Sequence, residues 1–184
     1  MYGDANEDGL KIAGADFLDA HGDNWIARQA SKFSVLNVHA REIPAAAARI
    51  FPELGDQQLL SPNLFYKMLL AVRAAAGKLF GWDRGMNWHG AEPLEVGKHC
   101  AFFLIEHVDA PRELAMSVEN RLTGALMGWV LEESAGRTRV FNVTCANFAG
   151  RQGRLYWRVI RPFHDGLIED SLKALERRVR QPAP

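Results

Sequence analysis

Residues 100–148 read CAFFLIEHVDAPRELAMSVENRLTGALMGWVLEESAGRTRVFNVTCANF, and residues 154–178 read RLYWRVIRPFHDGLIEDSLKALERR. In the first stretch, turn residues separate short apolar runs, which predicts strands near 98–107, 113–120, 123–133 and 138–148. In the second stretch, apolar residues recur every three or four positions, which predicts one long amphipathic helix. This order indicates an α+β fold in which a curved antiparallel sheet wraps around a long C-terminal helix, an arrangement that often encloses a cavity.

Upstream of these stretches, the chain predicts one strand and two shorter helices. Residues 32–40 alternate apolar and polar side chains, as a first strand does. Pro44–Phe51 suits a helix, since proline fits the first helical turn, and Ser61–Phe80 suits a second helix with Ser61 as its N-cap. Residues 15–20 predict a short helical turn, and residues 1–14 carry scattered glycines and acids. We therefore expect a flexible N-terminal arm over 1–14 and a single domain over 15–180.

The C-terminal helix carries one apolar face. At about 100° per residue, that face consists of Tyr156, Val159, Ile160, Phe163, Leu167 and Ile168, with His164 and Ser171 in the same arc. We expect this arc to face the sheet. Pro162 lies inside the helix, where it removes a backbone hydrogen bond and should bend the axis.

Composition and charge exclude several kinds of partner. The chain has 184 residues, 48% of them hydrophobic and 24% charged, with zero formal net charge, so its overall charge implies no electrostatic attraction to nucleic acid or an anionic membrane. No apolar stretch approaches the roughly 20 residues that span a bilayer, which predicts no membrane span. The N-terminus lacks the basic start and apolar core of a secretory signal, and two cysteines are too few for a disulfide framework. These features predict a cytoplasmic protein.

The chain contains few signals for metal or cofactor chemistry. Four residues invite a zinc interpretation: His99, Cys100, His107 and Cys145. Adjacent residues of a strand point to opposite faces, and the Cys-x-x-Cys spacing of zinc sites is absent, so we predict no metal. The glycine-rich phosphate and dinucleotide motifs and the Gly-x-Ser-x-Gly elbow are also absent, and we predict no cofactor.

Four segments resemble a bacterial family known only as domain-of-unknown-function family 2867. They are ADFLDA (15–20), KLFGW (78–82), VG (96–97) with FLIE (103–106), and GRLYW (153–157) through RPFH (161–164). The order of the elements is also similar to the helix-grip arrangement of the Bet v 1-like superfamily, which is START-related and of SRPBCC type. This resemblance implies a helix-grip domain with a cavity between the sheet and the last helix. The superfamily includes both carriers and enzymes, so the resemblance implies no single activity.

Three side chains are candidates for acid–base chemistry. His164 falls in the most specific matching segment and on the apolar face of the helix. A core histidine that is satisfied by a carboxylate or backbone carbonyl and helps to fix the bent helix is the simpler interpretation. If Glu106, or Glu119 on the next strand, faced inward, burial would raise its pKa and make it a possible partner for His164. A surface carboxylate is the simpler interpretation for both. Alternation groups Phe103 and Ile105 with His107, opposite Glu106, but both faces are apolar, so the inward face stays open.

Glycines and arginines gather where the long helix begins, over residues 150–154. Backbone N–H groups at such an end can bind an anion. Solvated arginines in a strand-to-helix turn are the simpler interpretation.

Three hypotheses of function follow from these features. In the first, a non-catalytic domain binds a small apolar molecule, lined by Phe103, Ile105, Met127, Trp129, Phe163 and Leu167, with His164 as a polar anchor. In the second, an enzyme on the same fold uses His164, with Glu106, as acid and base. In the third, an apolar sheet face or the Trp82–Trp88 loop forms a homodimer or another partner surface.

Overall fold

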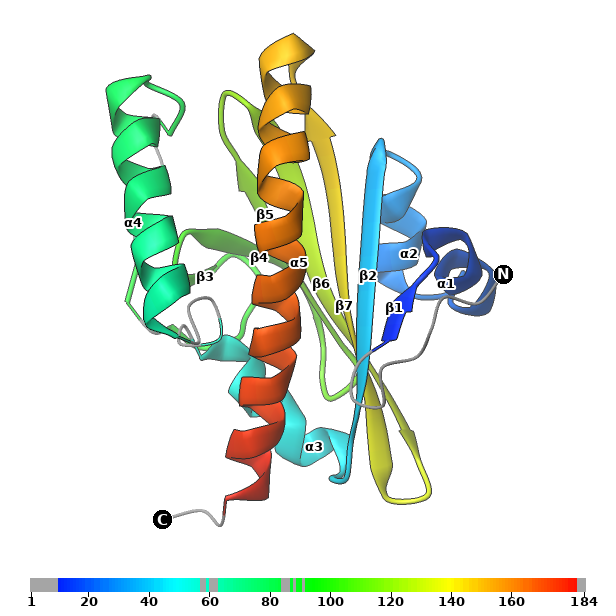
Figure 1. The fold of residues 1–184 in the computed structure, drawn as a ribbon. Helices are drawn as coiled ribbons and strands as arrows, with labels where there is room; N and C mark the ends of the chain where they lie inside the picture. The colour runs from blue at the N-terminus through cyan, green and yellow to red at the C-terminus, as the bar shows by residue number, and fades with distance from the viewer. Residues whose placement is uncertain are drawn as a thin grey trace.

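One antiparallel sheet of seven strands forms the centre of the described part of the chain (Figure 1). The computed structural model describes residues 10–56, 59, 63–83, 87, 89–90 and 92–181. The strands are β1 (Leu10–Ile12), β2 (Val35–Ile43), β3 (His99–Cys100), β4 (Phe103–Asp109), β5 (Glu113–Glu119), β6 (Thr123–Ser134) and β7 (Arg137–Phe148). They lie in the order β1-β2-β7-β6-β5-β4-β3. The helices are α1 (Gly14–Ala20), α2 (Trp25–Ala30), α3 (Ala47–Ile50), the 3₁₀ helix η1 (Phe51–Gly55), α4 (Leu64–Leu79) and α5 (Gly150–Arg180).

The predicted meander of strands is confirmed. Strands β5, β6 and β7 coincide with the predicted ranges to within a residue or two. The β6–β7 turn has positive φ at Ala135 (51°) and Gly136 (74°), as a two-residue hairpin turn that matches the sheet twist requires. The strand predicted over 98–107 is instead two strands, β3 and β4, because the backbone at Ala101 is left-handed (φ 56°) and reverses the chain.

Helices α3 and α4 begin at different residues from those that the sequence predicted. Helix α3 starts at Ala47 and not at Pro44, and the Ala47 N–H donates a 2.8 Å hydrogen bond to the Glu133 carboxylate. Helix α4 starts at Leu64, where the side chain of Asn63 caps the helix by accepting the Tyr66 N–H. Ser61, the predicted cap, lies outside the described residues. Helix α2 and the short strand β1 were not predicted.

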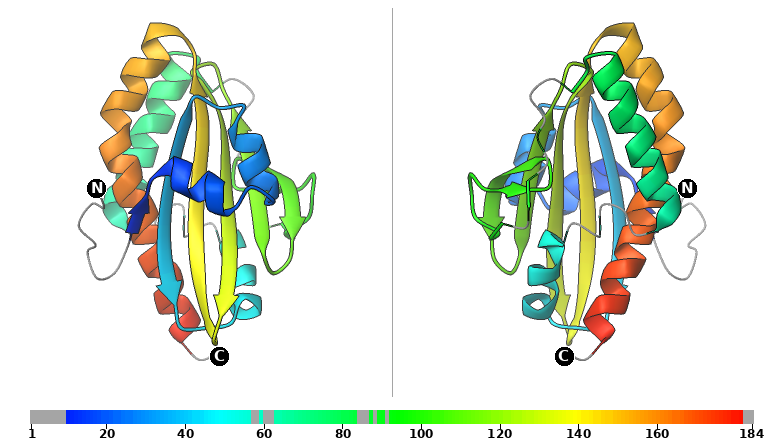
Figure 2. Two further views of the ribbon diagram at one scale, coloured as in Figure 1. Left: turned by 90° about the vertical axis from the view of Figure 1, so that its right-hand side faces the viewer. Right: turned by 90° about the vertical axis from the view of Figure 1, so that its left-hand side faces the viewer.

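The two faces of the sheet carry two separate cores. Helix α5, α3 and η1 cover the concave face (Figure 1), and α1 with α2 cross the opposite face (Figure 2). Gly128 permits the close approach of α2, since a Cβ at that position would lie 1.8 Å from Cδ1 of Ile26. Helices therefore cover both faces of the sheet. The curved sheet and the long C-terminal helix α5 together form the predicted α+β helix-grip arrangement.

Helix α5 lies over β2 and β7 and follows a curved path along the sheet (Figure 2). Its C-terminal half buries Ile168, Leu172, Leu175 and Val179 in the concave-face core. The N-terminal half differs from the prediction, because Val159 and Phe163 do not face the sheet: their exposed fractions are 57% and 39%. Among the described residues, no helix is both long and apolar enough to cross a membrane.

Candidate functional site

Polar side chains of β2 and β7 form a buried group beneath α5. In the register of the two strands, Asn37 lies opposite Thr144, and His39 lies opposite Asn142. All four are buried, and alternation places them on the α5 side, because Val38 and Val143 between them belong to the core of the other face. This polar patch sits where a sheet normally presents apolar residues to its covering helix.

Asp165 of α5 connects the helix to this patch. Its Oδ1 accepts a 2.8 Å hydrogen bond from Nδ2 of Asn37 and lies 3.4 Å from Nε2 of His39. His39 is 2% exposed, so this contact lies in a region from which water is largely excluded. A carboxylate in such surroundings orients the amide and the imidazole next to it.

The patch continues across the sheet into apolar surface. Asn142 pairs with Trp129 and Thr144 with Met127, and beyond them Met127 pairs with Met116, which pairs with Ile105. The structure thus brings together four of the residues predicted to line a cavity, Phe103, Ile105, Met127 and Trp129, in the concave-face core. The site has a polar end at β2 and β7 and an apolar end at β4 to β6.

Two buried donors lie at the boundary between these ends. The Nε1 of Trp129 and the Nδ2 of Asn142 have no hydrogen-bond partner among the described residues. Trp129 is 2% exposed and Asn142 is completely buried. Buried polar groups are nearly always hydrogen-bonded, and one left without a partner costs roughly 1–3 kcal/mol, so these two N–H groups require an explanation.

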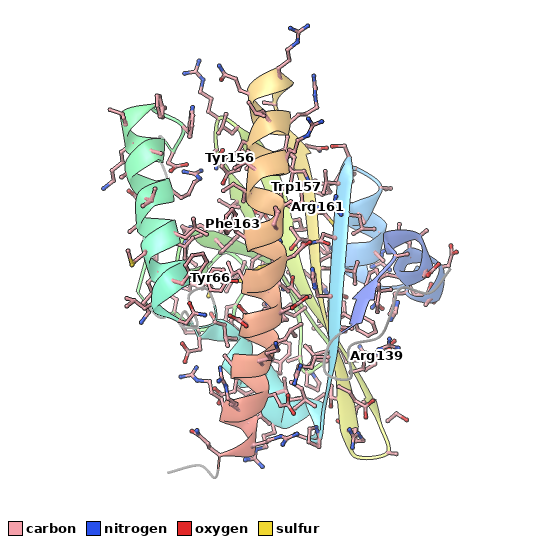
Figure 3. All side chains as sticks on the ribbon, in the orientation of Figure 1. Tyr66, Arg139, Tyr156, Trp157, Arg161 and Phe163 are labelled. Atoms are coloured by element: carbon pink, nitrogen blue, oxygen red, sulfur yellow. The ribbon has the colours of Figure 1, made fainter. Side chains whose placement is uncertain are left out.

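The three predicted site residues of α5 take different positions. His164 is half-buried beside Trp157, with ring centroids 5.4 Å apart, and Leu167 is also half-buried. Phe163 turns instead toward Phe65 of α4, with ring centroids 6.3 Å apart. Figure 3 shows Phe163 on the side of α5 that faces α4.

Glu106 lies on the opposite side of the sheet from α5. Its exposed carboxylate accepts a 2.6 Å hydrogen bond from Oγ of Ser117, whose strand neighbour Met116 faces the α5 side. The structure therefore does not bring Glu106 and His164 together. A β-bulge between Ile105 and His107 also shifts the alternation, so the predicted grouping of His107 with Ile105 is wrong. His107 instead stacks on Trp25 of α2, with ring centroids 5.0 Å apart.

Other sequence candidates lie apart from this site. Exposed Glu119 belongs to a surface pocket of about 560 Å³ that Gly81, Trp82, Asn120 and Arg121 also line. At the start of α5, a Cβ on Gly153 would lie 2.8 Å from the Leu122 carbonyl oxygen, so this glycine serves close packing. Trp88 of the predicted partner loop lies outside the described residues.

The two cysteines are buried on opposite faces of the sheet. Cys100 contacts the Gly55 carbonyl in the concave-face core, and Cys145 lies in the other core. Burial raises the pKa of Cys145 to about 12 and also raises the pKa of Cys100. Both thiols are therefore poor nucleophiles and poor metal ligands at neutral pH.

Helix α4 stands beside α5 and exposes an apolar stripe. The stripe comprises Leu64, Phe65, Met68, Val72 and Leu79, with exposed fractions between 56% and 80%. Polar contacts hold the helix in place: Arg73 pairs with both carboxylate oxygens of Asp83, at 2.6 and 2.8 Å, and donates to Oη of Tyr156 at 3.0 Å. Burial works against the charge of Arg73, yet its bonds to Asp83 and Tyr156 outweigh burial and raise its pKa.

Asn37, His39, Asn142 and Asp165 were not predicted from the sequence. The pairs Asn37-x-His39 and Asn142-x-Thr144 carry a signal, because polar residues at alternate positions of a strand share one face. That signal does not tell whether the polar face is exposed or buried. Only the packing of α5 on β2 and β7 decides it.

Comparison with known proteins identifies the family and supports the fold. A family model described as "Protein of unknown function (DUF2867)" matches residues 29–170. No curated protein matches the chain in sequence. An NMR structure of a protein from Arthrobacter aurescens is similar at 12% identity and TM-score 0.55, over 82% of this chain and 88% of that one. A crystal structure from Chromobacterium violaceum is similar at 12% identity and TM-score 0.50, over 80% of this chain and 98% of that one. At such identity, these likenesses show the fold alone.

Proposed function

The chain belongs to the DUF2867 family of proteins of unknown function, and from its site we propose that it binds a small, largely apolar molecule carrying a hydrogen-bond acceptor. The molecule would lie between the sheet and the N-terminal half of α5. The observation that carries this proposal is the pair of buried donors, Trp129 Nε1 and Asn142 Nδ2, without partners among the described residues. A carbonyl, carboxylate or hydroxyl oxygen of a ligand would accept from them.

The division of the sheet into polar and apolar ends supports a ligand of this kind. Small-molecule sites are mostly apolar with a few well-placed polar groups that orient the ligand. Met127 and Ile105 offer the apolar wall, while Asn37 and His39, oriented by Asp165, offer the polar one. A ligand with an apolar body and one polar end matches both walls.

The packing of α5 supports a ligand position beneath the N-terminal half of this helix. The buried apolar residues of α5 begin at Ile168 and continue to Val179, so the C-terminal half of the helix completes a solid core. Before Ile168, Trp157, Ile160 and His164 continue the helical phase of the buried residues, yet they are only half-buried, and Trp157 stacks on Phe148 of β7. The ligand would complete the core along this half, with His164 beside it. The resemblance to the Bet v 1-like superfamily is still a prediction. A cavity between the sheet and the last helix, which that resemblance implies, would lie at the same place.

Native mass spectrometry of gently purified protein tests the proposal. We expect an extra mass on the folded protein that denaturation releases. Trp129→Phe keeps the aromatic ring but removes the N–H, and should lower ligand affinity about tenfold, the equivalent of about 1.4 kcal/mol for one hydrogen bond. Trp82→Phe, at a half-buried tryptophan outside the site, serves as the matched control and should leave affinity unchanged. A bare mass, together with no binding of a panel of fatty acids and aromatic acids, would contradict the proposal.

The apolar stripe of α4 favours a second candidate function, self-association. Leu64, Met68 and Val72 recur at intervals of four, so they share one face of the helix. Exposed apolar faces of this kind mark protein interfaces. A second copy of the chain could bury the stripe against its own α4.

Analytical ultracentrifugation tests this second candidate. We expect the wild type to sediment as a dimer and the Met68→Glu/Val72→Glu variant to sediment as a monomer, because carboxylates in the interface would lose their hydration. Lys67→Glu, an exposed change on the same helix, is the control and should remain dimeric. A monomeric wild type over the whole accessible concentration range rules out self-association through α4.

A further inference from the structure

We propose that His89, Glu92 and His99 form a binding site for a divalent transition-metal ion of the Zn²⁺ type. One potential ligand atom from each of these residues lies within 4.8 Å of the other two. The site lies at the β3 edge of the sheet, three strands away from β6 and its Trp129. It is therefore separate from the ligand site proposed above and does not depend on it.

The three side chains are of the types that bind zinc. Two imidazole nitrogens and one carboxylate oxygen form the protein ligand set of several zinc sites, in which a fourth position holds water. Zinc–ligand bonds of about 2.0–2.1 Å place two ligands of one tetrahedral ion about 3.4 Å apart. The Nδ1 of His89 lies 3.6 Å from Oε1 of Glu92. This distance is close to the separation that one ion requires, and rotation of the histidine side chains would bring all three ligand atoms onto it.

The backbone around the three residues is held in place before any ion binds. The His89 N–H donates to the Ala101 carbonyl at 2.9 Å, which ties the loop to the end of β3. His99 lies in β3, and its N–H donates to Oε2 of Glu92 at 3.4 Å. The Glu92 carboxylate therefore lies next to both histidines. The backbone at His89 and at His99 is therefore positioned by these hydrogen bonds, which lowers the ordering cost of binding an ion there.

The two histidine rings lie close together, and one ring must turn out of the stack before both nitrogen lone pairs can point at one ion. The rings of His89 and His99 are stacked, with centroids 3.9 Å apart and planes 10° from parallel. Strand alternation turns Cys100, the neighbour of His99, into the concave-face core and leaves His99 on the loop side. All three proposed ligands are half-buried, so an ion can reach them from solvent. From the sequence we considered His99 as a zinc ligand only with Cys100, His107 and Cys145, and we predicted no metal. Only the folded chain brings His89 and Glu92 to His99.

Isothermal titration calorimetry with ZnCl₂ tests the site, on full-length protein first stripped with a chelator. We expect one ion to bind per chain. His99→Gln and Glu92→Gln should each weaken binding by at least about tenfold, because each removes a ligand. Glu95→Gln is the matched control: it removes an equal charge from an exposed side chain of the same loop and should leave binding unchanged.

A Co²⁺ titration followed by visible absorption gives an independent readout. Intense bands of a four-coordinate ion are expected in the wild type and in Glu95→Gln, and not in His99→Gln. Circular dichroism of each variant verifies folding, and His89→Gln replaces any variant that fails to fold. The proposal is overturned if the wild type shows no saturable zinc binding, or if the ligand variants and Glu95→Gln bind zinc equally well.

Discussion

The Nδ2 of Asn37 in β2 donates a 2.8 Å hydrogen bond to Oδ1 of Asp165, in the middle of α5. These two residues are 128 positions apart in the chain and meet beneath the helix. The contact connects the sheet to α5 just before the buried C-terminal half of the helix begins at Ile168. It therefore holds the less buried half of α5 above the polar end of the candidate site.

Removal of the Asp165 carboxylate should destabilise the fold. Asp165→Ala takes the acceptor away from the buried amide of Asn37 and from the neighbouring His39, so we expect the free energy of unfolding to fall by about 2–3 kcal/mol. Urea denaturation followed by tryptophan fluorescence measures the change. Glu169→Ala, at an exposed position of the same helix, should change stability by less than about 0.5 kcal/mol. Equal losses in both variants would show that the contact contributes nothing specific.

A methyl group on Gly128 should displace α2 from the sheet. Its Cβ would lie 1.8 Å from Cδ1 of Ile26, so Gly128→Ala should lower the free energy of unfolding by about 1–3 kcal/mol through overpacking. Gly124→Ala on the same strand is the control, because nothing lies within 4 Å of the added Cβ. In the double variant, Ile26→Val should recover part of the loss. Strict additivity of the two changes would argue against a clash at this position.

The buried thiol of Cys145 should make stability depend on alkaline pH. Burial raises its pKa from 9.0 to about 12, so above pH 9.0 the unfolded chain releases this proton before the folded chain does. The stabilisation is complete below pH 9.0 and is lost as the pH rises toward 12. Relative to Cys145→Ala, the wild type should lose up to about 1.4 kcal/mol per pH unit in that window. Urea denaturation of both proteins on either side of pH 9.0 measures the difference, which would stay constant if the thiol did not titrate.

The positions of β5, β6 and β7 could be predicted well because the signals for these strands are local. The turn at Asn120 shows this: its side chain accepts the N–H groups of Leu122 and Thr123, as an asparagine turn does, and the flanking strands begin and end close to the predicted residues. The bulge at Glu106 could not be predicted. It depends on the pairing of β4 with β5, and it transfers His107 to the opposite face.

The candidate site was predicted only in part, and the reason lies in the helix–sheet packing. Ile105, Met127 and Trp129 were expected to line a cavity, and they do share the α5 side of the sheet. Phe163 was expected beside them, but the presence of α4 turns it toward Phe65. Helical periodicity describes an arc of side chains and does not tell which neighbour each part of the arc meets.

By itself, the sequence determined the family, the α+β class, the order of the strands along the chain and the long closing helix, because these depend on periodicity and turn residues within short segments. Only the tertiary structure decided which sheet face lies under α5, and which polar residues meet there. It also decided that His89, Glu92 and His99 lie together. These contacts join residues far apart in the chain, such as Asn37 and Asp165. Their geometry depends on how whole elements pack, which no local pattern of residues records.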